Sequence, residues 1–132
     1  MGVFARVFGL CQTRPPADAG CWSFDRDKVV VDLNRAPELA VSGGAVRLEG
    51  GGLPWRVLVF RDQDGVLRAV INRCAHAGRR LDPVAGGQAL QCCSLGRSTF
   101  DVDGQRLGGP AKGGVRALAA VVDANFLAID LA

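Results

Sequence analysis

Short apolar runs alternate along this chain with turns rich in glycine, and no other feature of the sequence constrains the fold as strongly. The chain has 18 glycines, which lower helix propensity over most of its length. Only residues 35–40 favour a helical turn. We therefore predict an all-β domain of antiparallel strands. The apolar runs have the length of strands and occupy residues 29–33, 55–60, 66–72, 89–92, 115–122 and 126–131.

Three of the turns carry the residues of β-hairpins. Residues 62–65 read Asp-Gln-Asp-Gly and residues 103–104 read Asp-Gly. A glycine in such a turn readily adopts the positive φ that a tight hairpin requires. Residues 123–125 form a further turn, so we predict that residues 117–124 are a strand leading into a last hairpin, despite their alanines.

Length and composition fit one globular domain with an N-terminal extension. A chain of 132 residues is long enough to bury a single core. Hydrophobic residues make up 48% and charged residues 22%, which leaves little room for a long disordered region. Residues 1–24 contain Pro15 and Pro16 and no clean period, which predicts a tail or an arm laid over the domain. The folded domain is expected to span residues 25–132.

Charge and hydropathy argue against nucleic-acid-binding and membrane-spanning proteins. The net charge is +3, and Lys and Arg are scattered among Asp and Glu instead of forming a basic stripe. No apolar run approaches the roughly eighteen residues of a membrane-spanning helix. Residues 1–10 are short and interrupted by Arg6, so neither a transmembrane segment nor a cleaved signal peptide is expected.

The chain has five cysteines, and this odd number argues against a disulfide framework in a protein without an export signal. We therefore expect thiols in a reducing compartment, the cytoplasm, and their use in metal binding or redox chemistry. Nothing near Cys11 or Cys21 has the spacing of metal ligands, so these two are expected to be incidental thiols.

Two stretches combine cysteine with other residues of a metal site. Residues 74–81 read Cys-Ala-His-Ala-Gly-Arg-Arg-Leu, and residues 92–101 read Cys-Cys-Ser-Leu-Gly-Arg-Ser-Thr-Phe-Asp. The first stretch resembles the Cys-x-His loop of Rieske [2Fe–2S] domains, which take a second ligand pair from a Cys-x-x-His loop. The resemblance runs from about residue 29 to the C-terminus and includes Arg-Ala-Pro-Glu-Leu at residues 35–39, and Gly-Pro at residues 109–110.

This resemblance implies a Rieske-type sandwich or barrel of small antiparallel sheets, with two cluster-binding loops at one tip. It also implies a [2Fe–2S] cluster, with Cys74 and His76 as ligands from the first loop. The expected role is that of an electron carrier rather than an enzyme, working with a redox protein such as a reductase or an oxygenase. Arg79, Arg80 and Arg97 flank the loops and offer a docking surface for an acidic partner.

The second loop departs from the family pattern, because His76 is the only histidine in the chain. Two registers are open. If Cys92 is the second cysteine ligand, Leu95 stands in the histidine position; if Cys93 is the ligand, Gly96 stands there. Spacing to the following Phe-Asp pair slightly favours Cys93.

Three functions stay open. The domain is a ferredoxin-like electron carrier with an altered cluster, to which Cys92 and Cys93 could both be ligands if the loop bends between them. Alternatively, it is a degenerate Rieske module without a cluster that acts as a binding or structural subunit. In the third reading, Cys74, His76, Cys92 and Cys93 hold a single Zn²⁺ in a closed Cys₃His site.

Overall fold

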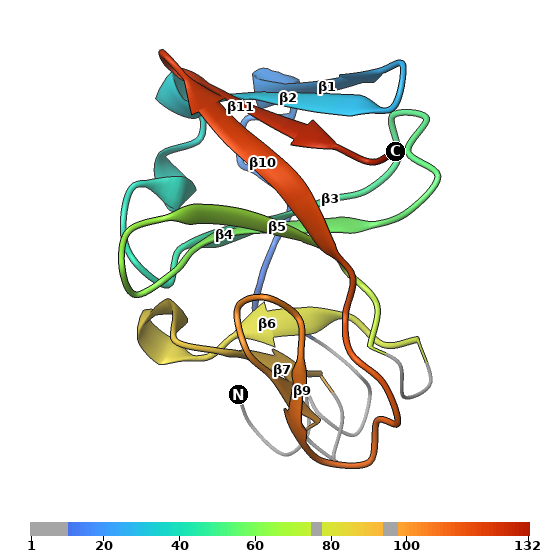
Figure 1. Ribbon diagram of the computed structural model, residues 1–132. Coiled ribbons are helices and arrows are strands. Elements are labelled where there is room, and N and C mark those ends of the chain that lie inside the picture. Colours follow the sequence, from blue (N-terminus) through green and yellow to red (C-terminus); the bar gives the residue numbers. More distant parts are fainter. Residues whose placement is uncertain (1–10, 75–77, 94–97) are drawn as a thin grey trace.

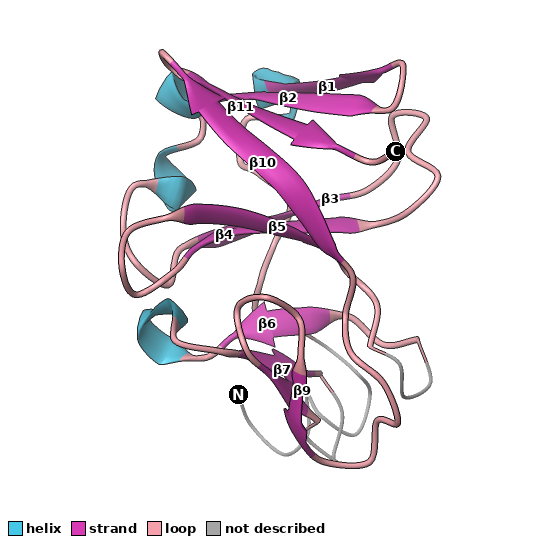
Figure 2. Cartoon of the chain, viewed as in Figure 1, coloured by secondary structure: helices cyan, strands magenta, loops and turns pink. Residues whose placement is uncertain are grey.

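The computed structural model describes residues 11–74, 78–93 and 98–132, which form two antiparallel β-sheets (Figure 1). The all-β prediction is confirmed, since the helical segments of these residues are short 3₁₀ turns (Figure 2). Two of them cover most of the expected helical turn at residues 35–40. None is long and apolar enough to cross a membrane. The 3₁₀ turns are η1 (Ala19–Cys21), η2 (Leu33–Arg35), η3 (Pro37–Leu39) and η4 (Ala85–Gly87).

The larger sheet has seven strands in the order β1-β2-β11-β10-β5-β4-β3, and each neighbouring pair is antiparallel. Strand β10 joins its two halves, because residues 117–118 pair with β5 and residues 119–123 pair with β11. The sheet thereby curls around one core. Its strands are β1 (Trp22–Asp25), β2 (Lys28–Asp32), β3 (Ala45–Leu48), β4 (Val57–Arg61), β5 (Leu67–Ile71), β10 (Ala117–Asp123) and β11 (Phe126–Asp130).

The smaller sheet lies below the larger one in Figure 1 and has the order β6-β7-β8-β9. Its strands are only two or three residues long. Such short strands bury too little surface to be stable alone, so this sheet depends on packing against the larger one. The strands are β6 (Leu81–Pro83), β7 (Leu90–Cys92), β8 (Thr99–Phe100) and β9 (Arg106–Gly108).

Strand β4 is a wall shared by two cores. Successive side chains of a strand point to opposite faces. Val57 and Val59 accordingly pack in the core of the larger sheet, whereas Leu58 and Phe60 pack in a second core against the smaller sheet. This division explains why the run is apolar throughout instead of alternating with polar residues. The second core contains Leu58, Phe60, Val70, Cys74, Leu81, Leu90, Cys92, Phe100, Ala111 and Val115.

Two of the three predicted turns connect expected strands, and the third, at residues 103–104, connects two short strands that were not expected. Residues 62–65 join β4 to β5, where Gly65 has φ +81°, and residues 123–125 join β10 to β11. Gly104, in the turn between β8 and β9, has φ +88°. A Cβ atom there would lie 2.0 Å from the carbonyl oxygen of Val115, so this turn also needs glycine for space.

Residues 11–21, here called the N-terminal arm, lie along the domain from β6 past β3 to β1 (Figure 1). The amide of Arg47 in β3 donates to the carbonyl of Arg14 at 3.0 Å. Cys21 at the end of the arm is buried in the first core. The first strand begins at Trp22, before the expected start of the domain at residue 25.

Candidate metal centre

Two cysteine thiols of the predicted site, Cys74 and Cys92, are fully buried in the second core. Cys92 is the last residue of β7 and pairs with Leu81 of β6. Cys74 follows β5, where its amide donates to the carbonyl of Arg79 at 2.7 Å and its carbonyl accepts from Gly78 at 3.1 Å. The fold thus brings a thiol from each predicted ligand loop into one apolar environment.

Asn72 and Arg56 position the first loop, and sequence reasoning missed both. Asn72 is 1% exposed, and its side-chain oxygen accepts from the amide of Leu81 at 2.8 Å. Arg56 donates to the carbonyls of Asn72 at 3.1 Å and Gly78 at 2.7 Å. An asparagine at the end of an apolar run, two residues before Cys74, is the sequence signal that could have indicated this role.

Cys93 lies outside this pair, because it forms a disulfide with Cys11 across 82 residues of sequence. The expectation that Cys11 is an incidental thiol is therefore wrong, as is the expectation that the chain has no disulfide. An odd cysteine count says nothing about which sulfurs the fold brings together. Disulfides are typical of oxidising compartments, so the cytoplasmic location stays a prediction.

Cys92 and Cys93 point to opposite sides of the chain, as neighbouring residues of an extended strand do. Cys92 faces the second core, whereas the sulfur of Cys93 lies beside Cys11 and the carboxylate of Asp82. Among the described residues, Cys11, Asp82 and Cys93 are the set of three whose ligand atoms lie within 4.8 Å of one another. The bend that would let both neighbouring sulfurs reach one metal is not seen here. His76, Leu95 and Gly96 lie outside the described residues.

Comparison with known proteins decides the family. The sequence pattern of the Rieske [2Fe-2S] domain matches residues 29–119, well over half of the chain. The chain belongs to the Rieske family. No curated protein matches this Rieske chain in sequence.

Solved Rieske structures share its fold. The ferredoxin of carbazole 1,9a-dioxygenase from Nocardioides aromaticivorans IC177 is 26% identical, with a TM-score of 0.61 over 78% of this chain and 95% of that chain. The quaternary ammonium Rieske monooxygenase CntA with L-carnitine is 19% identical, with a TM-score of 0.58 over 98% of this chain and 33% of that chain. Apo dicamba monooxygenase is 24% identical, with a TM-score of 0.57 over 70% of this chain and 30% of that chain. The Rieske chain thus matches nearly the whole ferredoxin but only about a third of each monooxygenase.

The donor residues fit a Rieske cluster only in part. The family's [2Fe–2S] cluster takes two cysteines and two histidines. Cys74 and Cys92 fit the cysteine positions, because both are buried thiols on the two loops. The histidine positions are not both filled, since the chain contains a single histidine, His76. Cys74, Cys92 and His76 together are one residue short of the family's standard set.

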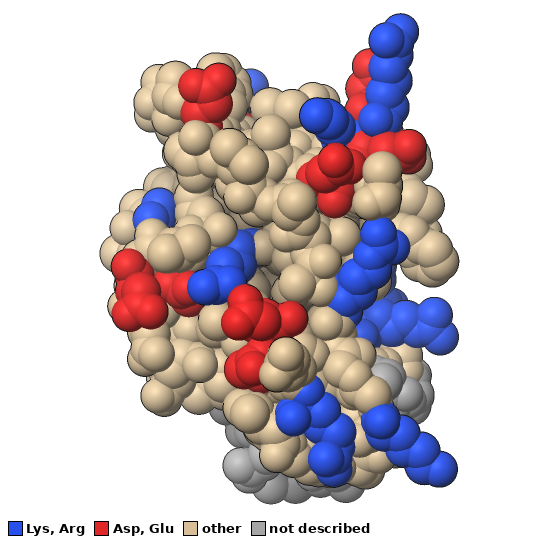
Figure 3. All heavy atoms as spheres, viewed as in Figure 1, with Lys and Arg blue, Asp and Glu red and all other residues tan. Residues whose placement is uncertain are grey.

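Arginines surround the first loop of the Rieske site. Arg80 donates through Nε and Nη2 to both carboxylate oxygens of Glu49, at 2.7 and 2.8 Å. These hydrogen bonds lower the pKa of Glu49. Burial is the main cause that lowers the pKa of Arg56, and the positive charges of Arg80 and then Arg73 lower it further. Figure 3 shows further Lys and Arg side chains at the lower right of its face, over the segment between β9 and β10. This end of the domain is therefore basic.

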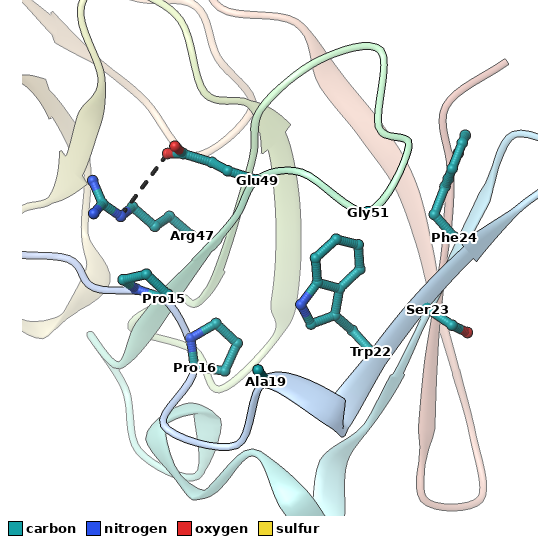
Figure 4. A pocket seen from close by; sticks show the side chains of 9 residues that line it. All are labelled: Pro15, Pro16, Ala19, Trp22, Ser23, Phe24, Arg47, Glu49 and Gly51. Atoms are coloured by element: carbon teal, nitrogen blue, oxygen red, sulfur yellow. Dashed lines mark ion pairs between the residues drawn. The ribbon is translucent and has the colours of Figure 1, made fainter.

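A groove of about 520 Å³ lies on another part of the domain, between the N-terminal arm and β1 (Figure 4). Trp22 and Phe24 of β1 line it opposite Pro15 of the arm, and Arg47 and Glu49 close one end. No cysteine lines this groove. It is separate from the candidate metal centre.

Proposed function

We propose that this Rieske domain is an electron-transfer module with an altered cluster site, whose cysteine ligands are Cys74 and Cys92. The observation that carries the proposal is the burial of both thiols in one core, between the two loops that hold the ligands in this family. A [2Fe–2S] cluster held there would supply reversible one-electron reduction. The match to 95% of a ferredoxin chain supports a carrier rather than a catalytic component.

Side chains of the second core prepare the two thiols for this role. Leu81, Leu90 and Phe100 are fully buried with them and exclude water. Asn72 ties the first loop to β6 through the amide of Leu81, so that the spacing of the loops is set before any metal binds. Cys92 is thus held at the end of β7, and Cys74 is held in a loop that backbone hydrogen bonds and Asn72 fix in place.

The disulfide supports the register in which Cys92 is the ligand, opposite to the preference drawn from spacing. The sulfur of Cys93 is bonded to that of Cys11, so Cys93 offers no thiolate to a metal. In the Cys92 register Leu95 takes the histidine position, and its side chain has no lone pair for iron. His76 is then the third ligand from this chain. The fourth ligand of the family's standard set is missing from this chain.

We further infer that the module works with an acidic redox protein, a reductase or an oxygenase. Arg56, Arg73 and Arg80 lie around the first loop with Glu49 as their acidic neighbour. Complementary charge of this kind accelerates and orients encounters between redox proteins. Binding to a reductase or oxygenase should therefore weaken as the salt concentration rises.

A second candidate function is a cluster-free Rieske module that acts as a binding or structural subunit. The single histidine favours it, because the family's ligand set is not complete. The Cys₃His zinc site has less support, since the disulfide removes Cys93 from the four residues it needs.

Installing the missing histidine tests the proposal. Wild type, Leu95→His, Gly96→His and Cys74→Ser are purified anaerobically with iron supplied, and iron, acid-labile sulfide and reduced-state electron paramagnetic resonance spectra are compared. Gln63→His is the matched control, because it adds a histidine at an exposed hairpin position. We expect a Rieske-type signal in Leu95→His alone, and no iron in Cys74→Ser.

Three other outcomes would revise the ligands, the completeness of the site or the function. A Rieske-type signal in Gly96→His would transfer the ligand role to Cys93. A full complement of iron and sulfide in wild type, with a spectrum unlike that of Rieske proteins, would contradict the incomplete site but not the carrier role. If wild type and both histidine variants fold and bind no iron, the cluster-free module replaces the carrier.

A further inference from the structure

A second group of metal-ligand residues lies on the face of β7 opposite Cys92. Cys11, Asp82 and Cys93 bring two sulfurs and a carboxylate oxygen within 4.8 Å of one another. Asp82 and Cys93 are 3% and 0% exposed, and Cys11 is partly buried. These residues share no side chain with the candidate cluster site, so what they bind is independent of the proposed function.

The pairing of β6 with β7 creates this group. Leu81 pairs with Cys92, and Asp82 pairs with Gln91. Because side chains alternate along each strand, Asp82 and Cys93 project to the face away from the second core. The register of two short strands therefore separates one pair of sulfurs, Cys74 and Cys92, from the group that contains Cys93.

Hydrogen bonds between Asp82 and the N-terminal arm hold Cys11 at this face of β7. The two carboxylate oxygens of Asp82 accept from the arm amides of Gln12 at 2.8 Å and Thr13 at 2.9 Å. Each carboxylate oxygen has a second lone pair, which these hydrogen bonds leave for another interaction. Asp82 therefore places a buried carboxylate with spare acceptor capacity beside the two sulfurs.

We propose that Cys11, Cys93 and Asp82 form a redox-gated site for a thiophilic divalent cation, with Zn²⁺ as the expected ion. In the oxidised state the two sulfurs are bonded to each other and the site is closed. A dithiol reductant opens it: the disulfide takes up two electrons and two protons and becomes two thiols, while the reductant becomes a disulfide. Metal binding then displaces the two thiol protons and forms two sulfur–metal bonds and one bond to Asp82.

Charge and geometry suit such an ion. Two thiolates and one carboxylate carry three negative charges against two positive charges on the metal, and Cys and Asp are ordinary zinc ligands. Two sulfurs bound tetrahedrally at about 2.3 Å from zinc lie about 3.8 Å apart. Reaching this separation requires only a modest movement of the Cys11 side chain, which is not packed in a core. Solvent fills the fourth coordination position of the metal.

Cobalt binding to the full chain tests the proposal, because Co²⁺ bound to thiolates absorbs in the near ultraviolet and visible. Metal-free protein is titrated with Co²⁺ in the reduced and the oxidised state, and zinc is measured after exposure to Zn²⁺ alone. Cys11→Ser removes a ligand of this site only, and Cys74→Ser removes one of the other site. Cys21→Ser is the control for loss of a buried cysteine elsewhere.

We expect reduced wild type, Cys74→Ser and Cys21→Ser to show the thiolate–cobalt band of this site. Oxidised wild type and Cys11→Ser should lack it, and Asp82→Asn should bind cobalt at least about tenfold more weakly. Circular dichroism establishes that each variant is folded. Because Asp82→Asn also perturbs the hydrogen bonds between Asp82 and the arm, the result for Cys11→Ser decides the test.

The proposal is overturned if reduced wild type shows no band beyond that of Cys11→Ser, or if the oxidised protein binds cobalt equally well. It is also overturned if Cys11→Ser loses iron and sulfide together with cobalt, because the two sites would then not be separate. Loss of iron from every preparation with retention of the cobalt band would remove the proposed function and leave this site standing.

Discussion

Removal of the Cys11–Cys93 disulfide should lower the free energy of unfolding by several kcal/mol. The bridge closes a loop of 82 residues. The loss of chain entropy in the unfolded state for a loop of this length corresponds to about 4.5 kcal/mol at 25 °C. The free energy of unfolding of a small domain is only about 5–15 kcal/mol, so the predicted loss is a large part of the total.

Cys11→Ser is the cleaner of the two possible variants. Cys11 is partly exposed, so a serine hydroxyl there can reach water. Cys93 is fully buried, and Cys93→Ser would add the cost of a buried hydroxyl without an assured partner, about 1–3 kcal/mol. The arm keeps its hydrogen bonds to Asp82 in both variants. We therefore expect a loss of about 2–4 kcal/mol in Cys11→Ser, and a larger loss in Cys93→Ser.

Urea unfolding with and without reductant measures these losses, with a chelator present to exclude metal binding. Tryptophan fluorescence and circular dichroism report the transition. Reductant should lower the stability of wild type to that of Cys11→Ser and leave Cys11→Ser unchanged. Equal stabilities of wild type and Cys11→Ser under oxidising conditions, within about 0.5 kcal/mol, would refute the reasoning.

Two further predictions concern the hairpin turns. Gly104→Ala should cost more stability than Gly65→Ala in thermal melts, because its Cβ would lie 2.0 Å from the Val115 oxygen, whereas nothing lies within 4 Å at Gly65; similar melting temperatures would contradict this. Burial opposes ionisation of Asp62, but Arg68 at 2.6 Å and two hairpin amides outweigh it and lower the pKa of Asp62. Its contribution to stability is present above the unfolded pKa of about 3.9 and is lost as pH falls through the folded pKa. The stability difference between wild type and Asp62→Asn in urea should therefore shrink from pH 7 toward pH 2, and a constant difference would exclude this role.

Local sequence determined the class of fold and most of its longer strands. Val29 and Val31 alternate with exposed neighbours in β2, and the turn at residues 62–65 lies between two apolar runs, so strands and hairpin follow from nearest-neighbour preferences. Strands β1, β3, β6, β8 and β9 escaped prediction, and the last three have only two or three residues, too few for a readable period. The Cys-x-His pattern from which we predict the first ligand loop is also local, since Cys74 and His76 are two residues apart in sequence.

Only the tertiary structure decided which sulfurs meet. Strand alternation requires that Cys92 and Cys93 point to opposite faces, but it does not say which of them faces Cys74. That choice depends on the pairing of Leu81 with Cys92, and a slip of one residue would exchange the two cysteines. The partner of Cys93 comes from 82 residues away, held in place by hydrogen bonds from the arm to Asp82. Contacts over such separations depend on the packing of whole sheets, which no local pattern encodes.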